Sequence, residues 1–195
     1  MHKGIRLLAV LISCIFILVL SIFPTKISIS IVSDLLSGKV NAYENENNNI
    51  ANLIIQSNYL IAHAGGGIDG LKYTNSLEAV ENSIRNGFKM IELDLLTSLD
   101  GEIVAAHDWN HFHSITDSNQ TNKISHFDFM RKKIYGTYHP LDIATATDKL
   151  NKNDIILITD KIQDLNNLSK HRLNKNRTVV EVFSIEKYNE AISLG

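Results

Sequence analysis

Short, strongly apolar runs recur along the second part of the chain and are separated by stretches with helical spacing. The runs lie at residues 59–62, 88–95, 103–106, 155–159 and 178–183. Most of them are continuously apolar, whereas a strand with one face in water would alternate between apolar and polar residues. The pattern therefore predicts strands that are buried on both faces, as in a parallel sheet covered by helices.

Helical periodicity is found between and after these runs, at residues 75–87, 125–134, 141–150, 164–172 and 185–194. The first of these segments has marked ends. Asn75 is suited to an N-cap, Glu78 follows three residues later as in a capping box, and Gly87 is suited to the end of a helix. Strands that alternate with helices predict an α/β fold built from βα units.

The longest apolar segment stands at the N-terminus. Lys3 and Arg6 precede an uncharged apolar run of 17 residues, Leu7 to Phe23. This length lies between a signal-peptide apolar region of ~7–15 residues and a membrane-spanning helix of ~17–25. We expect a membrane anchor at residues 1–25, with a cleaved signal as the alternative. Because positive charge before the run favours an inside N-terminus, the domain would lie on the extracytoplasmic side of the cell membrane, or be secreted.

Composition narrows the classes of function for the remaining chain. Residues 26–57 include a polar, aperiodic stretch and are expected to be a linker to a domain at 58–195. With 19 Lys and Arg against 21 Asp and Glu, the net charge of −2 argues against a nucleic-acid partner. The single cysteine, Cys14, excludes a disulfide framework and a cysteine-based zinc site.

Candidate catalytic side chains accompany each of the first four apolar runs. His63 follows the first run, Glu92 and Asp94 lie within the second, His107 follows the third, and Asp160 follows the fourth. Active sites of α/β barrels lie at the carboxyl ends of the strands. We therefore expect two imidazoles and three carboxylates at one rim.

The chemistry of this set indicates phosphodiester cleavage. Glu92 and Asp94 are two residues apart on a strand, so they share a face, where two carboxylates repel each other unless a cation lies between them. Together with Asp160 they form an oxygen-rich cluster suited to Ca²⁺ or Mg²⁺. Two histidines beside such a metal are suited to general acid–base catalysis at neutral pH, and a metal that neutralises oxyanions suits a phosphodiester.

Several motifs in order resemble those of the glycerophosphodiester phosphodiesterase family. They are Ile61-Ala62-His63-Ala64-Gly65-Gly66, Thr74-Asn75-Ser76-Leu77-Glu78-Ala79, Gly87 through Asp94, and Asp100-Gly101 through His107-Asp108. The match runs from 59 to 109, and more loosely to 161. The resemblance implies a metal-dependent barrel related in fold and mechanism to phosphatidylinositol-specific phospholipases C. Residues 58–195 supply 138 residues, and a (β/α)₈ barrel typically takes ~250, so we expect a TIM-type (β/α) barrel truncated after about five strands.

The resemblance also implies roles for individual residues. His63 would be the base that acts on the attacking glycerol hydroxyl, and His107 the acid that protonates the leaving alcohol. The implied metal ligands are Glu92, Asp94 and Asp160, and the implied substrate contacts are Asn75, Lys161 and Trp109. Asn75 would orient groups at the site while capping its helix.

Two positions depart from the family pattern. The family commonly has Arg after the first His, where this chain has Ala64. It commonly has one residue between the acid and the lysine of the fourth strand, whereas Lys161 follows Asp160 directly. On a continuing strand, Lys161 would therefore point to the opposite face.

For the residues directly after His107, we expect local structural roles. Asp108 is expected to orient or cap locally rather than to bind metal. Trp109, His111 and His113 are expected in a solvated polar loop.

Three functions are compatible with these observations. The first is an enzyme that hydrolyses glycerophosphodiesters to glycerol 3-phosphate and an alcohol. The second is a catalytically inactive, truncated binding module or remnant, because an open barrel exposes a sheet edge and favours association. The third is a phospholipase-like enzyme on lipid headgroups, which differs from the first only in substrate.

Overall fold

The structure is a computed structural model in which residues 52, 54–55 and 60–194 are described. The anchor or signal segment expected at 1–25, and nearly all of the linker expected at 26–57, lie outside the described residues. Within the described part, none of the helices combines the length and the apolar character that crossing a bilayer requires.

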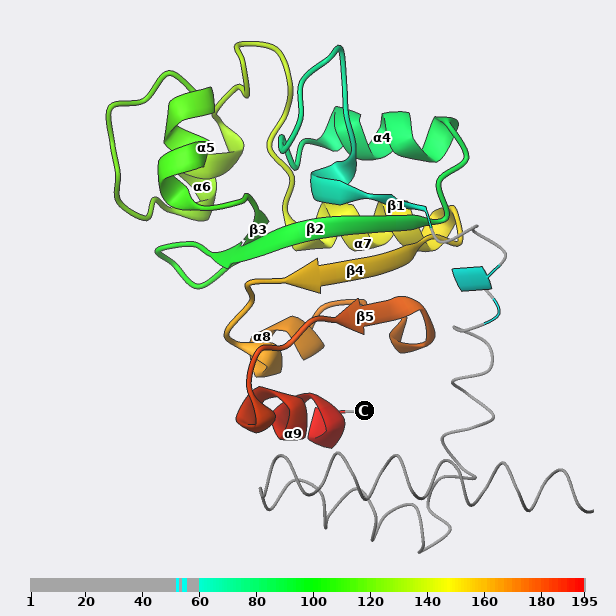
Figure 1. Ribbon diagram of the computed structural model, residues 1–195. Helices are drawn as coiled ribbons and strands as arrows, with labels where there is room; N and C mark the ends of the chain where they lie inside the picture. The colour runs from blue at the N-terminus through cyan, green and yellow to red at the C-terminus, as the bar shows by residue number, and fades with distance from the viewer. Residues whose placement is uncertain (1–51, 53, 56–59, 195) are drawn as a thin grey trace, which may run out of the picture. The chain divides into compact units, whose positions relative to one another are not determined.

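Four strands form a parallel sheet in the order β1-β2-β4-β5 (Figure 1). They are β1 (Ile61–Ala62), β2 (Met90–Thr97), β4 (Ile156–Asp160) and β5 (Thr178–Val180). A further strand, β3 (Ile103–Ala105), pairs with β2. Each of the five predicted apolar runs contains a strand, so the predicted number of strands is confirmed.

The direction of β3 differs from the prediction of a parallel sheet. β3 runs antiparallel to β2, and the two are joined by a tight turn in which the Ser98 amide donates to the Glu102 carbonyl at 2.8 Å. A parallel crossover needs a dozen or more residues, so the short connection between the two strands permits only an antiparallel hairpin. β3 therefore lies outside the parallel sheet, which consists of β1, β2, β4 and β5.

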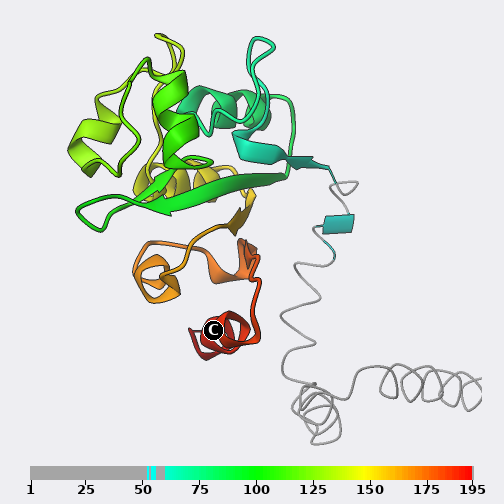
Figure 2. The same cartoon turned by 60° about the vertical axis from the view of Figure 1, so that its left-hand side comes forward.

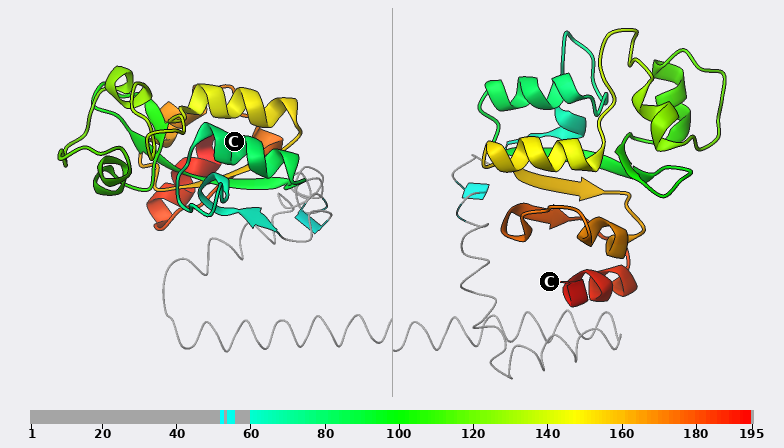
Figure 3. Two further views of the ribbon diagram at one scale, coloured as in Figure 1. Left: turned by 90° about the horizontal axis from the view of Figure 1, so that it is seen from above. Right: turned by 180° about the vertical axis from the view of Figure 1, so that it is seen from behind.

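Two helices cover one face of the parallel sheet. They are α4 (Leu77–Arg85) and α7 (Ile143–Lys152), which Figures 1 and 3 show on the same side of the strands. Alternate strand positions supply the apolar side chains that meet these helices in the main core, which includes Val80, Ile91, Leu93, Leu95, Ile143, Ala146, Leu150 and Leu157. The intervening positions of β2 and β4, which include Glu92, Asp94 and Asp160, turn to the other face of the sheet.

The start of α4 lies one residue later than predicted. Ser76, not Asn75, is the N-cap, and its hydroxyl accepts from the Ala79 amide at 3.2 Å. Asn75 has a φ of 48°, in the left-handed region, so it cannot take the extended conformation of an N-cap. The predicted cap at Asn75 was wrong because the neighbouring hydroxyl satisfies the helix and leaves the amide side chain for another partner.

The residues after β3 form a small second core rather than a solvated loop. Helix α5 (Trp109–Ile115) lies beside α6 (His126–Met130) in Figure 2. The rings of Phe112 and Phe129 join the two helices by stacking at 4.2 Å. His113 of α5 is buried, and its Nε2 contacts the Asn122 carbonyl at 2.8 Å. The predicted loop over Trp109–His113 was therefore wrong, because the aromatic residues give that segment an apolar face.

The last described elements lie on the β5 side of the sheet. These are α8 (Leu165–Ser169), the 3₁₀ turn η2 (Lys175–Arg177) and α9 (Ile185–Leu194). The helices predicted at 141–150, 164–172 and 185–194 are confirmed, and the one predicted at 125–134 is present as the shorter α6.

Asp142 links helix α6, which contains His126, to helix α7, which covers the sheet. Replacing Asp142 gives a prediction about the stability of the protein. It caps α7 by accepting from the Thr145 amide at 2.8 Å and meets His126 Nε2 at 2.9 Å. Burial opposes ionisation, but the hydrogen bonds from Thr145 and the His126 contact lower the pKa of Asp142 below its usual value of 3.8. We expect Asp142→Ala to lower the free energy of unfolding by about 1–2 kcal/mol at pH 7.

The effect of Asp142 has a defined pH dependence. Because its pKa is lower in the folded protein, its stabilisation is present above the unfolded pKa and is lost as pH falls through the folded pKa. Urea denaturation at pH 7 and at pH 3 measures this difference. Asp142→Asn is the matched control, since it keeps the cap and removes the charge. Equal stabilities of Asp142→Ala and the unaltered chain at pH 7 would contradict the assignment.

Candidate active site

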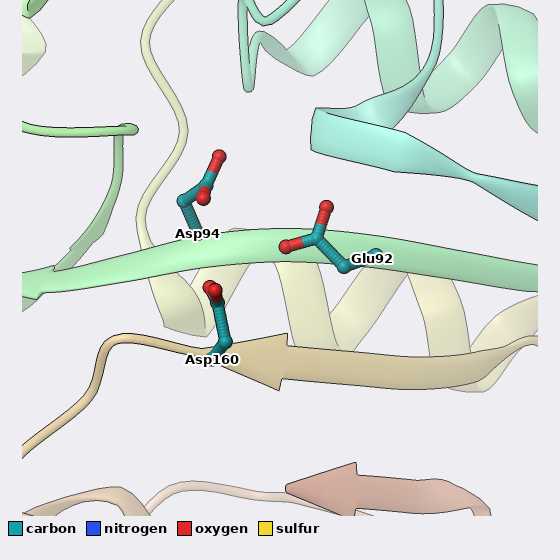
Figure 4. A group of neighbouring side chains, drawn as sticks. All are labelled: Glu92, Asp94 and Asp160. Carbon is teal, nitrogen blue, oxygen red and sulfur yellow. The ribbon is translucent and has the colours of Figure 1, made fainter. Parts of the chain in front are cut away.

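Three carboxylates meet at the carboxyl ends of two neighbouring strands. Glu92 and Asp94 lie on β2, and Asp160 is the last residue of β4 and the register partner of Asp94. One oxygen from each of the three lies within 4.8 Å of the others (Figure 4). The predicted juxtaposition follows from the parallel register, which places equivalent strand ends side by side.

The donor set is suited to a hard cation. Asp160 Oδ1 is buried and has no hydrogen-bond partner among the described residues. Burial, and then the neighbouring charge of Asp94, raise the pKa of Asp160 above its usual value. Burial also raises the pKa of Glu92, to which the charge of Asp94 contributes. A cation bound by these oxygens would relieve both penalties, so the three residues fit Ca²⁺ or Mg²⁺.

Asp94 is the buried centre of the cluster. Its side chain is 1% exposed. Its carboxylate is paired with Lys161 Nζ at 2.5 Å and with Asn75 Nδ2 at 2.8 Å. Burial alone would raise its pKa, but the hydrogen bonds from Lys161 and Asn75 bring the pKa of Asp94 below its usual value. Each carboxylate oxygen has two acceptor positions, so these contacts leave Asp94 able to bind a cation as well.

Lys161 lies on the site face, in agreement with its predicted place at the site but contrary to the expectation from strand alternation. The prediction assumed that the strand continues, but β4 ends at Asp160 and Lys161 has a φ of 61°. This left-handed residue redirects the chain, and the amide of Ile162 donates to the Asp160 carbonyl at 2.7 Å. The lysine thereby reaches Asp94, although the spacing differs from the family pattern.

Lys161 contacts Oδ1 of Asp94, and Asn75 contacts the other carboxylate oxygen, Oδ2. Its Nδ2 donates to Asp94 Oδ2, its Oδ1 accepts from the Asp94 amide at 3.1 Å, and its own amide donates to the Ala64 carbonyl at 3.0 Å. The predicted role of Asn75 in orienting the site is therefore supported by the contacts. Asparagine adopts the left-handed conformation found here more readily than most other residues.

Asn75→Gly tests this role without straining the backbone, because glycine tolerates the positive φ. Loss of the hydrogen bonds to a charged partner is expected to cost about 1.5–3 kcal/mol of stability. Chemical denaturation measures the loss. Asp117→Gly, at an exposed position outside the site with a φ of 50°, is the matched control for glycine at a positive φ, and an Asn75→Gly variant as stable as the unaltered chain would contradict the assignment.

His63 stands at the entrance to the cluster. It begins the 3₁₀ turn η1 (His63–Gly65), and its Nε2 lies 3.6 Å from Glu92 Oε2. The next residue, Ala64, has a φ of 51° and donates its amide to the same oxygen at 2.7 Å. The edge of the His63 ring meets Tyr73, with centroids 5.2 Å apart.

The glycines after Ala64 serve packing against α4. Gly66 has a φ of 97°, and a Cβ there would lie 2.1 Å from Ser83 Oγ. Ser83 in turn donates to the Gly65 carbonyl at 2.8 Å. Close approach of the turn to the helix therefore explains the glycines without any ligand.

His107 follows β3 and lies near Asp94. The amide of Ala106 donates to the Asp94 carbonyl at 2.9 Å, which ties the end of β3 to the site. His107 Nδ1 lies 2.6 Å from Asp108 Oδ2. This contact orients the His107 ring through Nδ1 and leaves its other nitrogen, Nε2, available.

Asp108 orients His107 and caps α5 at once. Its Oδ1 accepts from the His111 amide at 2.8 Å. That hydrogen bond, and then the contact with His107, lower the pKa of Asp108 below its usual value despite some burial. The prediction that Asp108 orients and caps is confirmed.

Two further residues bear on the site. Trp109, a predicted substrate contact, packs its ring against Phe112 and Phe129 in the second core, and its contact with substrate stays a prediction. Glu181, to which the sequence assigned no role, follows β5 directly, and its amide donates to the Thr159 carbonyl at 2.8 Å. Its charge contributes to the raised pKa of Asp160. Its place at the carboxyl end of a strand, like that of Asp160, was the available signal.

Solved structures with the same fold include three informative matches. A glycerophosphoryl diester phosphodiesterase from Parabacteroides distasonis is 19% identical, with a TM-score of 0.56 over 69% of this chain and 50% of its own. A putative one from Agrobacterium tumefaciens is 17% identical, with a TM-score of 0.55 over 69% and 60%. A phosphodiesterase from Oleispira antarctica, in complex with the product sn-glycerol-3-phosphate, is 18% identical, with a TM-score of 0.56 over 69% and 61%.

The chain spans 50–61% of the length of these three structures. Its parallel sheet of four strands fits part of a (β/α) barrel. No curated protein sequence matches the chain. The sequence model of the glycerophosphoryl diester phosphodiesterase family, however, matches residues 63–193. This match covers well over half of the chain and contains all five residues of the carboxylate and histidine set, so the chain belongs to the glycerophosphoryl diester phosphodiesterase family.

Proposed function

We propose that the protein is a metal-dependent phosphodiesterase that hydrolyses glycerophosphodiesters to glycerol 3-phosphate and an alcohol. The observation that carries the proposal is the meeting of three carboxylates within 4.8 Å of one another at the carboxyl ends of the strands, with His63 beside Glu92 and His107 near Asp94. Family membership supports the same reaction class, and one structural relative holds glycerol 3-phosphate as product.

In this proposal, Glu92, Asp94 and Asp160 hold Ca²⁺ or Mg²⁺. When bound, the cation would neutralise negative charge on the phosphate oxygens. Lys161, on the same side of the cluster, places a further positive charge where phosphate oxygens would lie. Asn75 keeps Asp94 in position through the paired hydrogen bonds described above.

The two imidazoles divide the proton transfers. His63 takes the proton from the glycerol hydroxyl, whose oxygen forms a bond to phosphorus. The bond from phosphorus to the leaving alcohol breaks, and His107 donates a proton to that alcohol's oxygen. Water then opens the cyclic phosphodiester with the two histidines in exchanged roles, which restores both protonation states and yields glycerol phosphate.

The substrate is a small-molecule phosphodiester or the headgroup of a lipid. The anchor predicted at 1–25, which lies outside the described residues, would place the domain on the extracytoplasmic side of the membrane. This location stays a prediction, with secretion as the alternative.

A second candidate function is a binding module without catalysis. The observation that favours it is that the chain spans 50–61% of the matched structures, together with Ala64 where the family commonly has Arg. Such a module would bind glycerol 3-phosphate in the presence of metal but would not turn over a diester.

Phosphorus NMR of the full chain with glycerophosphocholine separates the two functions. The enzyme converts the diester signal into that of glycerol 3-phosphate with Ca²⁺ or Mg²⁺, and EDTA stops the conversion. The binding module broadens the signal of added glycerol 3-phosphate and leaves the diester intact. Conversion that is unaffected by EDTA would contradict the proposed dependence on metal.

A further inference from the structure

A tyrosine with an unusual backbone conformation contacts one of the two proposed catalytic histidines. The ring of Tyr73 meets that of His63 with centroids 5.2 Å apart and ring planes at 86°. Tyr73 has a φ of 58°, which lies in the left-handed region. For a bulky side chain this conformation is an outlier, and it persists only where the surrounding contacts impose it.

Left-handed residues other than glycine are concentrated at the active site. The described part of the chain has eight of them, and three are aspartates, which adopt this conformation more readily than most residues. Four contact the carboxylates or His63, namely Ala64, Tyr73, Asn75 and Lys161. In three of these four, a hydrogen bond to Glu92 or Asp94 gives the conformation a purpose. Tyr73 has no such bond, and strained residues at a site commonly serve a ligand.

The loop that carries Tyr73 is held in place by hydrogen bonds near its tip. Ile68 and Leu71 exchange two backbone hydrogen bonds, at 3.1 and 2.8 Å, around a two-residue turn. The Tyr138 hydroxyl donates to Asp69 Oδ2 in that turn at 2.6 Å, which attaches the loop to the segment that leads to α7 (Figure 1). The fold therefore sets the position of Tyr73 before a ligand arrives, and such preorganisation lowers the entropic cost of binding.

Both the ring and the hydroxyl of Tyr73 are available to a ligand. Tyr73 is 46% exposed, and its hydroxyl has no hydrogen-bond partner among the residues that the structure describes. An aromatic ring packs against carbon-bound hydrogens, and a phenolic hydroxyl both donates and accepts hydrogen bonds. Glycerol offers a short carbon chain together with hydroxyl groups, so its chemistry matches both parts of the tyrosine side chain.

We propose that Tyr73 binds the glycerol unit of the substrate and thereby selects glycerophosphodiesters. The inference rests on the proposed function, in which His63 takes the proton of a glycerol hydroxyl. A hydroxyl that is hydrogen-bonded to His63 places the rest of the glycerol beside the ring that contacts His63. The ring of Tyr73 packs against the carbon chain, and its hydroxyl bonds the terminal hydroxyl of the glycerol. Esterification of that hydroxyl removes the hydrogen bond, so deacylated diesters are preferred to intact phospholipids.

Calorimetric titration of the full chain in the presence of Ca²⁺ or Mg²⁺ tests the contact without requiring turnover. The two probes are sn-glycerol 3-phosphate and inorganic phosphate, which lacks the glycerol unit. We expect the unaltered chain to bind glycerol 3-phosphate about tenfold more tightly than phosphate, and Tyr73→Gly to lose this preference while its affinity for phosphate stays the same. Tyr73→Phe keeps the ring and should lose less than Tyr73→Gly.

A second tyrosine provides a matched control. Tyr135 is 45% exposed and has a φ of 49°, but its amide donates to the Ile115 carbonyl at the end of α5, outside the carboxylate cluster. Glycine tolerates a positive φ, so both Tyr73→Gly and Tyr135→Gly should melt close to the temperature of the unaltered chain. Tyr135→Gly should also bind glycerol 3-phosphate as tightly as the unaltered chain does.

Steady-state kinetics give a second readout that a merely structural role would not move. 2-Hydroxyethyl phosphocholine keeps the attacking hydroxyl but lacks the third carbon of glycerol and its hydroxyl. Tyr73→Gly should therefore raise KM for glycerophosphocholine about tenfold and leave KM for the shorter diester unchanged.

Two results would overturn the role of Tyr73. They are a Tyr73→Gly variant that binds glycerol 3-phosphate as tightly as Tyr135→Gly, and an unaltered chain that binds glycerol 3-phosphate no better than phosphate. The expected binding without any turnover would support the role of Tyr73 and contradict the proposed hydrolysis, so the two proposals fail separately.

Discussion

His107→Ala is expected to lower kcat for glycerophosphocholine by ~10²–10⁴-fold, the usual contribution of a general acid or base. His107 reaches the site through the link between Ala106 and Asp94 and is oriented by Asp108 at 2.6 Å. Because His107 is not one of the clustered carboxylates, the rise in melting temperature caused by Ca²⁺ or Mg²⁺ should be kept. Steady-state kinetics and thermal melts on the same preparation measure both.

The leaving group shows whether His107 acts as the acid. A diester with p-nitrophenol as leaving group needs less protonation, so the loss caused by His107→Ala should shrink with that substrate. His63→Ala should impair both substrates to a similar extent, since His63 is assigned to the attacking hydroxyl. His171→Ala, at the end of α8 and outside the site, is the control for loss of a histidine. Metal-dependent turnover of glycerophosphocholine by His107→Ala within about threefold of the unaltered chain would refute the mechanism.

Asp160→Asn is expected to abolish metal binding while leaving the metal-free protein at least as stable. Asp160 faces Asp94 in register and has a raised pKa, so its ionised form is destabilising above the folded pKa, and the neutral amide removes that penalty. For the unaltered chain, metal at about 100 times its Kd should add about 2.7 kcal/mol, a rise in Tm of about 5–10 °C. In Asp160→Asn this rise, and turnover with it, should disappear.

Misfolding and loss of a metal ligand would change the Tm of the metal-free Asp160→Asn protein in different ways, so this variant can tell them apart. A general loss of folding would lower the Tm of the metal-free protein, whereas loss of a ligand leaves that Tm unchanged or higher. Asp117→Asn, an exposed site outside the cluster, controls for the change in net charge. If Asp160→Asn responds to Ca²⁺ and Mg²⁺ as the unaltered chain does, Asp160 does not bind the metal.

Local sequence was sufficient to find the strands and most of the site. His63, His107 and Asp160 come directly after apolar runs, and Glu92 and Asp94 lie two apart within one. Parallel strand ends meet at one edge, so the positions of these residues along the chain already indicate a cluster. The approximate positions of α7, α8 and α9 and the capping role of Asp108 followed from short-range patterns in the same way.

The direction of β3 and the helix over Trp109–Ile115 were harder to predict from the sequence. Apolar run length identifies a strand but carries no information on its partner, and only the short turn at Ser98–Glu102 requires an antiparallel pair. The aromatic residues of α5 became core residues because α6 brings Phe129 against Phe112. Both outcomes depend on contacts between segments rather than on either segment alone.

The order of apolar runs and of the polar residues after them therefore determined the strand set, the carboxylate cluster and the flanking histidines. The tertiary structure alone decided that Lys161 reaches Asp94 and that Asn75 holds Asp94 instead of capping α4. Both depend on single residues in the left-handed region, with φ of 61° and 48°. One such residue turns a side chain to another face, and for residues other than glycine this conformation is held by surrounding contacts that residue spacing does not encode.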